Sequence, residues 1–199
     1  MPTAFDGGIM SEGTVKLVID AKKILEGNLA SSMGLDEYRV IMEQVRKVDV
    51  SKNREFQKAF DYFYKVRRDA EWRKIYFNLF EKMKSGPVCF SDILTEMYEK
   101  TGRVEASFSS KMLATIDSNQ PIWDQNVLNN LGLRLSAGSG KKHLQEAIEI
   151  YAEIEKWYQG FLPTDNAREC VKIFNDFFPD YRWISDVKKI DCLLWSLRE

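Results

Sequence analysis

The feature that most constrains the fold of this chain is a helical repeat of large apolar side chains, which recurs along almost its whole length. The clearest example follows Asp69, and its apolar positions are Trp72, Ile75, Tyr76, Leu79, Phe80 and Met83. Because an α-helix turns once in about 3.6 residues, this spacing places these side chains on one face. We interpret such aromatic stripes as parts of a core, not as platforms for stacking bases. Strand-like alternation of apolar and polar residues is missing from the sequence, so the pattern predicts an all-α protein.

Turn and capping residues divide the chain into about ten predicted helices. We expect them near residues 14–25, 36–47, 51–66, 70–83, 91–101, 105–116, 124–130, 141–158, 163–177 and 185–197. Ser51 and Ser91 are predicted N-caps, Phe90 is a candidate hydrophobic staple, and Gly160 is expected to end the eighth helix. The helices are too short and the loops too varied for a simple four-helix bundle. We therefore expect a single globular array over residues 14–199, preceded by a loose lead-in over residues 1–13.

Composition excludes several classes of protein. A hydrophobic content of 44% with 13% aromatic residues is typical of a folded globular chain. The net charge of -1 provides no overall attraction to nucleic acid or acidic lipid, so such binding requires a local basic face. No apolar run approaches the roughly 18 residues that a membrane span needs. The first residues, MPTAFDGGIMSEG, have neither a basic nor an apolar signal region, so we expect a cytoplasmic protein without a membrane partner.

Cysteine and histidine usage predicts no metal site and no cofactor. Cys89, Cys170 and Cys192 are far apart in the sequence and read as reduced thiols, most of them buried. His143 is the single histidine and lies at a polar helix start, where we expect it to be exposed. The run 138–142, Gly-Ser-Gly-Lys-Lys, precedes a helix whose amides are able to hold a phosphate, but it lacks the full P-loop pattern. We interpret this run as a flexible loop with a helix start.

The stretch from Gly102 to Gly132 carries the main candidate for a functional site. A turn glycine is followed by an amphipathic helix, a polar loop, and a Pro-Ile-Trp-Asp run that opens a second helix at Asp124. A carboxylate at a helix start is able to stabilise a developing cation or to activate water. Aspartate is also among the best N-cap residues, because its side chain satisfies free backbone amides. The sequence leaves both roles open for Asp124.

This stretch, about residues 92–132, resembles the centre of the helix-hairpin-helix DNA glycosylases, the endonuclease III-like superfamily. In that family a hairpin turn presents amides to a DNA phosphate, and a catalytic aspartate follows about twenty residues later. Here the resemblance assigns the turn to Gly102 and the catalytic aspartate to Asp124. It also aligns Val127 with a family valine and places Asn126 where histidine is usual.

The resemblance implies further roles and also has limits. Trp123 and Asn126 are implied as substrate-binding residues, with Trp123 as a pocket wall, and Arg103 with the amides after Gly102 as a phosphate anchor. The turn has one glycine where the family has two, and Val104 occupies the position of the family's lyase lysine. Lys111 lies a helical turn or two later and is a further substrate-binding candidate. The runs 108–113 and 121–124 also resemble those of uncharacterised small bacterial helical proteins, which implies no activity.

Two hypotheses for function remain. The first is a DNA glycosylase-like base-excision or DNA-binding protein that uses a local basic face, such as the positively charged region 52–74. It expects Asp124 to face a cleft rimmed by lysine and arginine. The second is a non-catalytic helical module for protein–protein interaction or self-association. It expects Asp124 to accept hydrogen bonds from the amides of Asn126 or Val127, with no cavity beside it and an exposed apolar patch elsewhere.

Overall fold

The structure is a computed structural model that describes residues 17–27 and 33–197. This part of the chain is all-helical and contains no strand, which confirms the predicted fold class. Its helices are α1 (Ala21–Glu26), α2 (Leu35–Gln44), α3 (Arg54–Tyr64), α4 (Ala70–Met83), α5 (Phe90–Thr101), α6 (Ala106–Ile116), α7 (Gln125–Asn130), α8 (Gly140–Phe161), α9 (Asp165–Phe177), the 3-10 helix η2 (Pro179–Tyr181) and α10 (Asp186–Ser196). None of these helices is long and apolar enough to cross a lipid bilayer.

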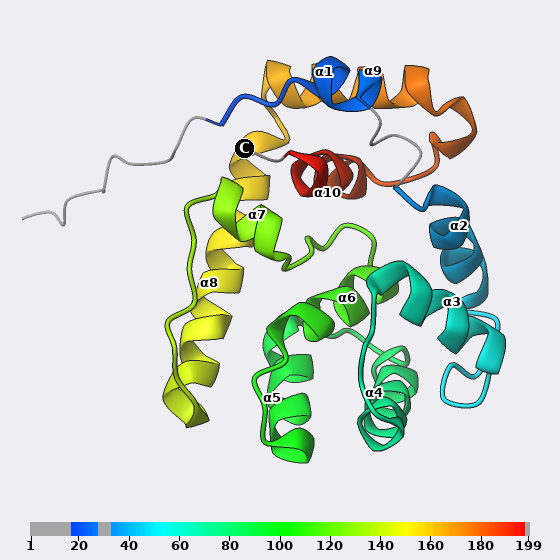
Figure 1. The fold of residues 1–199 in the computed structure, drawn as a ribbon, viewed down its shortest axis with the longest axis vertical. Helices are drawn as coiled ribbons and strands as arrows, with labels where there is room; N and C mark the ends of the chain where they lie inside the picture. The colour runs from blue at the N-terminus through cyan, green and yellow to red at the C-terminus, as the bar shows by residue number, and fades with distance from the viewer. Residues whose placement is uncertain (1–16, 28–32, 198–199) are drawn as a thin grey trace, which may run out of the picture.

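The helices form two groups that α6 and α8 connect (Figure 1). In one group α1 packs on α9, and α10 contacts α7 and α9. In the other group α4 packs on α5, which also contacts α6 and α8. The α2–α3 pair flanks both groups on the side opposite α8 (Figure 1). The helices cross at varied angles instead of lying parallel, so the array is not a simple bundle (Figure 1).

The core between α3 and α4 is built from aromatic rings. Phe60 is fully buried, and its ring centroid lies 5.8 Å from that of Tyr76, 5.7 Å from that of Phe77 and 5.6 Å from that of Phe80. The rings meet in tilted or edge-to-face arrangements, which are the favourable geometries for aromatic pairs. The interpretation of these stripes as core is therefore confirmed.

Two predicted N-caps are wrong by two residues. The Ser51 hydroxyl instead donates a hydrogen bond to the Asp49 carboxylate in the preceding turn. Asn53 caps α3, where its side-chain oxygen accepts from the amide of Phe56 at 2.8 Å. The α5 helix starts before Ser91, because Cys89 is its N-cap and the Asp92 carboxylate accepts from the Cys89 amide.

The Phe90 side chain is not a staple residue outside the helix. Phe90 is the first residue of α5, and its ring stacks on Tyr151 of α8 with centroids 3.8 Å apart. Gly160 does not end α8 either, because the helix continues to Phe161. The Phe161 ring is buried and stacks on Trp157 at 4.6 Å, which favours the extra turn despite the glycine.

The first predicted helix also differs from the structure. Its start at Thr14 and the lead-in 1–13 lie outside the described residues. Residues 17–20 are not helical, and Asp20 caps α1 just before Ala21. The Ile19 backbone instead pairs with the Asn166 side chain of α9, which accepts from the Ile19 amide at 2.9 Å and donates to its carbonyl at 3.0 Å. These bonds satisfy the Ile19 backbone groups that a helix would otherwise pair.

Candidate functional site

The loop between α6 and α7 positions Asp124 through backbone hydrogen bonds. The Tyr151 hydroxyl donates to the Pro121 carbonyl at 2.8 Å, and the Trp123 amide donates to the Ser110 hydroxyl at 2.8 Å. Asp124 then adopts an extended backbone and caps α7, where its Oδ1 accepts from the Asn126 amide at 2.9 Å. The N-cap role of Asp124 is therefore observed directly.

Asp124 also lines a pocket of about 430 Å³, so the cap does not enclose the carboxylate. The pocket walls come from the start of α2, the end of α3, α6, the loop before α7, and α10. Its charged residues are Lys65, Lys111, Lys188, Glu37, Asp124 and Asp191. The three lysine charges equal the three carboxylate charges in number, and the pocket lining includes no arginine. The expectation that the cap leaves no cavity is therefore not met, and of the expected rim of lysine and arginine the pocket has the lysines alone.

The Lys111 side chain on α6 is half-buried in this pocket and makes no hydrogen bond or ion pair with another described residue, and the exposed Lys65 side chain makes none either. The Nζ of Lys111 lies 5.2 Å from the Phe108 ring centroid and 5.9 Å from that of Tyr64. Burial lowers the pKa of Lys111, and the neighbouring Asp124 charge opposes part of that shift. A lysine with a lowered pKa holds more of the neutral amine, which is the nucleophilic form.

Lys188 and Asp191 form a buried ion pair on α10 within the same pocket lining. Lys188 Nζ donates to Asp191 Oδ2 at 2.9 Å, and the Tyr158 hydroxyl donates to Asp191 Oδ1 at 3.4 Å. Burial is the largest single influence on the pKa of Lys188 and lowers it, but the neighbouring groups, with Asp191 first among them, together raise that pKa well above its usual value. Lys188 therefore stays protonated and is not a candidate nucleophile.

Aromatic side chains from α3 and α10 complete the pocket. Tyr62, Phe63 and Tyr64 come from the end of α3, and Trp195 comes from α10. Tyr62 is 63% exposed, which is unusual for a large aromatic side chain. Sequence reasoning missed these residues as part of the site. The only local signal is that Tyr62 lies off the buried stripe of α3.

Three other predicted site residues lie outside this pocket. Trp123 is buried and stacks on Phe90, with ring planes 7° apart. The Asn126 amide group donates to the Trp195 carbonyl at 3.0 Å and thereby ties α7 to α10. Arg103 is exposed after the αL turn at Gly102, and its backbone amide already donates to the Thr101 hydroxyl. The structure thus brings Lys111 to Asp124 but places Trp123, Asn126 and Arg103 elsewhere.

Of the histidine and the three cysteines, Cys192 lines the Asp124 pocket and the other three do not. His143 is half-buried, not exposed as expected, and its Nδ1 lies 3.8 Å from the Glu146 carboxylate. Cys170 and Cys192 are buried free thiols, which confirms the expectation for most cysteines, and Cys89 is exposed. Within residues 17–27 and 33–197, no cluster of three His, Cys, Asp or Glu side chains is suited to hold a metal ion.

No protein-family model, curated protein or solved structure matches this chain.

Proposed function

We propose that the Asp124 pocket binds a nucleobase turned out of a nucleic-acid strand, and that the protein releases this base by cleaving its bond to the sugar. The observation that carries the proposal is the shared position of Asp124 and Lys111 in one aromatic-walled pocket. The volume of about 430 Å³ falls within the usual range of roughly 300–1,000 Å³ for small-molecule sites. The weak resemblance to helix-hairpin-helix glycosylases agrees with this assignment.

The N-cap role of Asp124 is compatible with catalysis. The cap uses Oδ1, and Oδ2 makes no hydrogen bond or ion pair with any residue that the structure describes. When the bond between the sugar carbon and the base breaks, its electron pair leaves with the base and positive charge develops on the sugar. A fixed carboxylate beside the sugar stabilises that charge. The cap bond to the Asn126 amide holds Asp124 in place for this role.

Lys111 supplies the nucleophile that acts together with the Asp124 carboxylate. Its neutral amine attacks the sugar carbon as the base departs, so a carbon–nitrogen bond forms while the bond to the base breaks. The amine loses a proton, and the departing base gains one. The bond between the sugar carbon and the ring oxygen then breaks, the ring oxygen takes up a proton, and the lone pair of the nitrogen forms the second bond of a Schiff base, which is the species that borohydride reduces. The rings of Tyr62, Phe63 and Trp195 provide surfaces on which a flipped base is able to stack. In an alternative route, a water molecule attacks the sugar carbon in place of the Lys111 amine, and no covalent intermediate forms.

The test is release of base from oligonucleotides that carry uracil, oxidised purines or alkylated purines. Asp124→Asn should abolish release. Lys111→Met should abolish the adduct that borohydride traps with the wild-type protein. Glu169→Gln and Lys172→Met change exposed α9 residues by the same chemistry and should leave both readouts intact. No base release from any substrate, together with no saturable binding of free nucleosides, would overturn the proposal.

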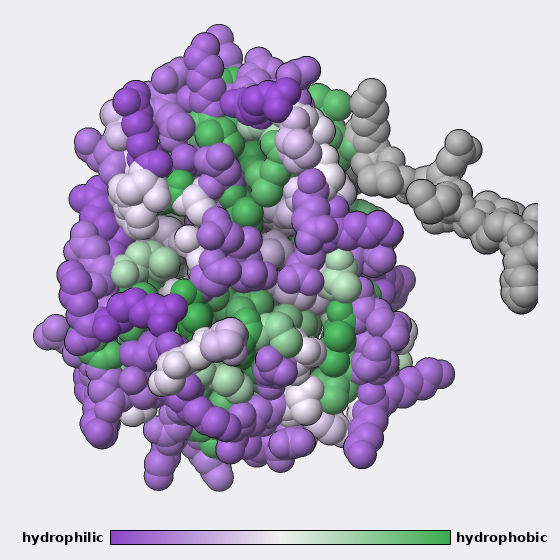
Figure 2. Space-filling model, turned by 180° about the vertical axis from the view of Figure 1, so that it is seen from behind, coloured by the Kyte–Doolittle hydropathy of each residue, from purple (hydrophilic) through white to green (hydrophobic). Residues whose placement is uncertain are grey.

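A non-catalytic interaction module is the second candidate, and an exposed aromatic side chain favours it. Trp183 is 49% exposed although its ring stacks on Tyr38 at 5.9 Å, and Val40 is 41% exposed. Figure 2 shows that apolar side chains on the back of the molecule form several separate areas bordered by hydrophilic ones. Sedimentation analysis of wild type and Trp183→Ser decides this candidate, because a self-association surface predicts a concentration-dependent mass that the substitution removes.

A further inference from the structure

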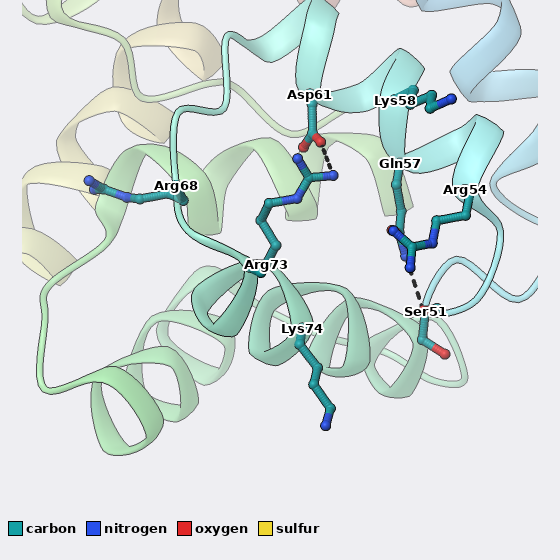
Figure 3. A pocket seen from close by; sticks show the side chains of 9 residues that line it. Ser51, Arg54, Gln57, Lys58, Asp61, Arg68, Arg73 and Lys74 are labelled. Atoms are coloured by element: carbon teal, nitrogen blue, oxygen red, sulfur yellow. Dashed lines mark hydrogen bonds and ion pairs between the residues drawn. The ribbon is translucent and has the colours of Figure 1, made fainter.

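A groove of about 770 Å³ between α3 and α4 concentrates positive charge on a protein whose net charge is -1. Its charged lining residues are Arg54, Lys58, Arg68, Arg73, Lys74 and a single carboxylate, Asp61. Figure 3 shows that these side chains come from both helices and from the segment between them. An excess of cations in a concave site raises the local concentration of anions.

Two of the arginines have partners that fix them. Arg73 forms an ion pair with Asp61 across the groove (Figure 3). Arg68 donates to the Glu105 carboxylate at 2.8 Å and lies 5.2 Å from the Phe108 ring centroid. These contacts hold two guanidinium groups in defined positions, and they neutralise only part of the charge of the groove.

Arg54, Lys58 and Lys74 have no such partners. All three are exposed, and none makes a hydrogen bond or ion pair with another residue in the described part of the chain. Arg54 extends from α3 into the space between the helices, whereas Lys58 and Lys74 point outward from α3 and α4 (Figure 3). Unpartnered cations therefore stand on both walls of the groove.

We propose that this groove binds the phosphate groups of a nucleic-acid strand. No aromatic side chain lines the groove, so it offers no surface for base stacking. The aromatic pocket at Asp124 differs in this respect. Recognition of the groove ligand therefore rests on the charged backbone and is independent of base sequence.

The position of α3 connects this groove with the base pocket. Arg54, Lys58 and Asp61 of α3 line the groove, and the following residues Tyr62 and Tyr64 line the pocket. A strand held along the groove thus lies against the helix whose last turn borders the base-binding pocket. This assignment rests on the proposed function and deepens it, because it identifies the surface that binds the phosphate backbone of the nucleic acid.

The experiment measures binding of a fluorescently labelled strand made entirely of abasic residues, by anisotropy at several salt concentrations. This probe has a phosphate backbone and no base, so it reports on the groove alone. The triple variant Arg54→Ser/Lys58→Ser/Lys74→Ser should bind about tenfold or more weakly at low salt. Its salt slope should fall by about 2, since each phosphate contact with a single strand contributes about 0.7.

A matched control removes three exposed lysines from α8 and α9, as Lys142→Ser/Lys156→Ser/Lys172→Ser. This control changes the net charge equally and should retain most of the affinity. Far-UV circular dichroism and thermal melting verify that both variants are folded. Equal losses in the two variants would show a diffuse charge effect and overturn the proposal, as would no binding of the abasic strand by wild type.

Tripolyphosphate serves as a competitor to distinguish a nucleic-acid strand from a small phosphorylated ligand. The proposal expects the strand to bind more tightly than tripolyphosphate, because the groove contacts several successive phosphates. Tighter binding of tripolyphosphate would overturn the assignment to nucleic acid. Saturation-transfer NMR with free nucleosides measures binding to the Asp124 pocket separately. A groove that binds no strand and a pocket that binds no nucleoside therefore give different results.

Discussion

Lys188 Nζ and Asp191 Oδ2 lie 2.9 Å apart on α10, one helical turn from each other, and both side chains are buried. The Asp191 carboxylate compensates the buried Lys188 charge inside the group of helices that contains α10, where an unpaired ion would be strongly unfavourable. This relationship makes α10 sensitive to the loss of either partner.

Asp191→Ala should lower the free energy of unfolding by about 3–5 kcal/mol, because it leaves the Lys188 charge buried without a partner. The double variant Lys188→Met/Asp191→Leu should recover most of that loss, since apolar side chains of similar size fill the same space. Urea unfolding of the three proteins measures both effects. A double variant as unstable as Asp191→Ala would contradict this explanation.

The helical architecture was predictable from sequence because its signals are local. Apolar spacing marks the buried faces, and Asp69, Thr164 and Ser185 at helix starts each accept a hydrogen bond from a backbone amide of the first turn. Wrong boundaries occur where another contact competes with the local signal. Ser51 is the clearest case, because its hydroxyl bonds Asp49 and leaves the cap to Asn53.

The candidate site was predictable only in part. Lys111 and Asp124 lie in one stretch of sequence, and both were named as site residues from that stretch. The opposite walls come from residues near 62–65 on α3 and 188–195 on α10, which are far away along the chain. Their approach depends on how the helices pack, and no local spacing encodes it. The same limit applies to the groove, because charge in the region 52–74 does not reveal which side chains lack partners.

The structural and chemical roles of Asp124 should separate by substitution. Asp124→Ala should lower the free energy of unfolding by about 1 kcal/mol, because it removes the cap bond to the Asn126 amide. Asp124→Asn should stay within about 0.5 kcal/mol of wild type, because asparagine caps equally well. Chemical unfolding measures these differences. An equally large loss in Asp124→Asn would show that the carboxylate charge, and not only the cap, stabilises the fold.

Lys111 should titrate at a lower pH than the surface lysines. Burial lowers its pKa, whereas Asp124 raises it, so Asp124→Asn should lower the Lys111 pKa further. NMR of protein whose lysines carry ¹³C-methyl groups resolves the individual titrations, and Lys111→Arg assigns the signal. An unchanged Lys111 pKa in Asp124→Asn would show that the two charges do not interact across the pocket.

Gly34 at the edge of the pocket should tolerate no side chain. Its φ is +64°, and an added Cβ would lie 3.0 Å from the Phe63 ring. Gly34→Ala should therefore lower the free energy of unfolding by about 1–2 kcal/mol, because alanine is strained in the left-handed backbone conformation. Displacement of the Phe63 ring should lower it further. Gly102→Ala is the matched control, because its φ is +68° and a Cβ there meets nothing within 4 Å. Thermal unfolding should show a larger loss for Gly34→Ala than for Gly102→Ala.

Asp61 should make stability depend on pH in the direction opposite to that of an ordinary ion-paired carboxylate. Burial raises its pKa from 3.8 to about 6, and Arg73 of α4 only partly opposes that shift. The other charged residues that line this groove are Arg54, Lys58, Arg68 and Lys74.

Because the folded pKa of Asp61 exceeds the unfolded value, the folded state binds its proton more tightly. The stability that this proton provides is fully present below pH 3.8, and it is lost as the pH rises to about 6. Asp61→Asn cannot lose a proton and should avoid this loss. The melting temperature of Asp61→Asn minus that of wild type should therefore increase between pH 4 and pH 7, which calorimetry at several pH values measures. Titration of all other groups cancels in this difference, so a constant difference would show that Asp61 ionises in the folded protein as it does in the unfolded chain.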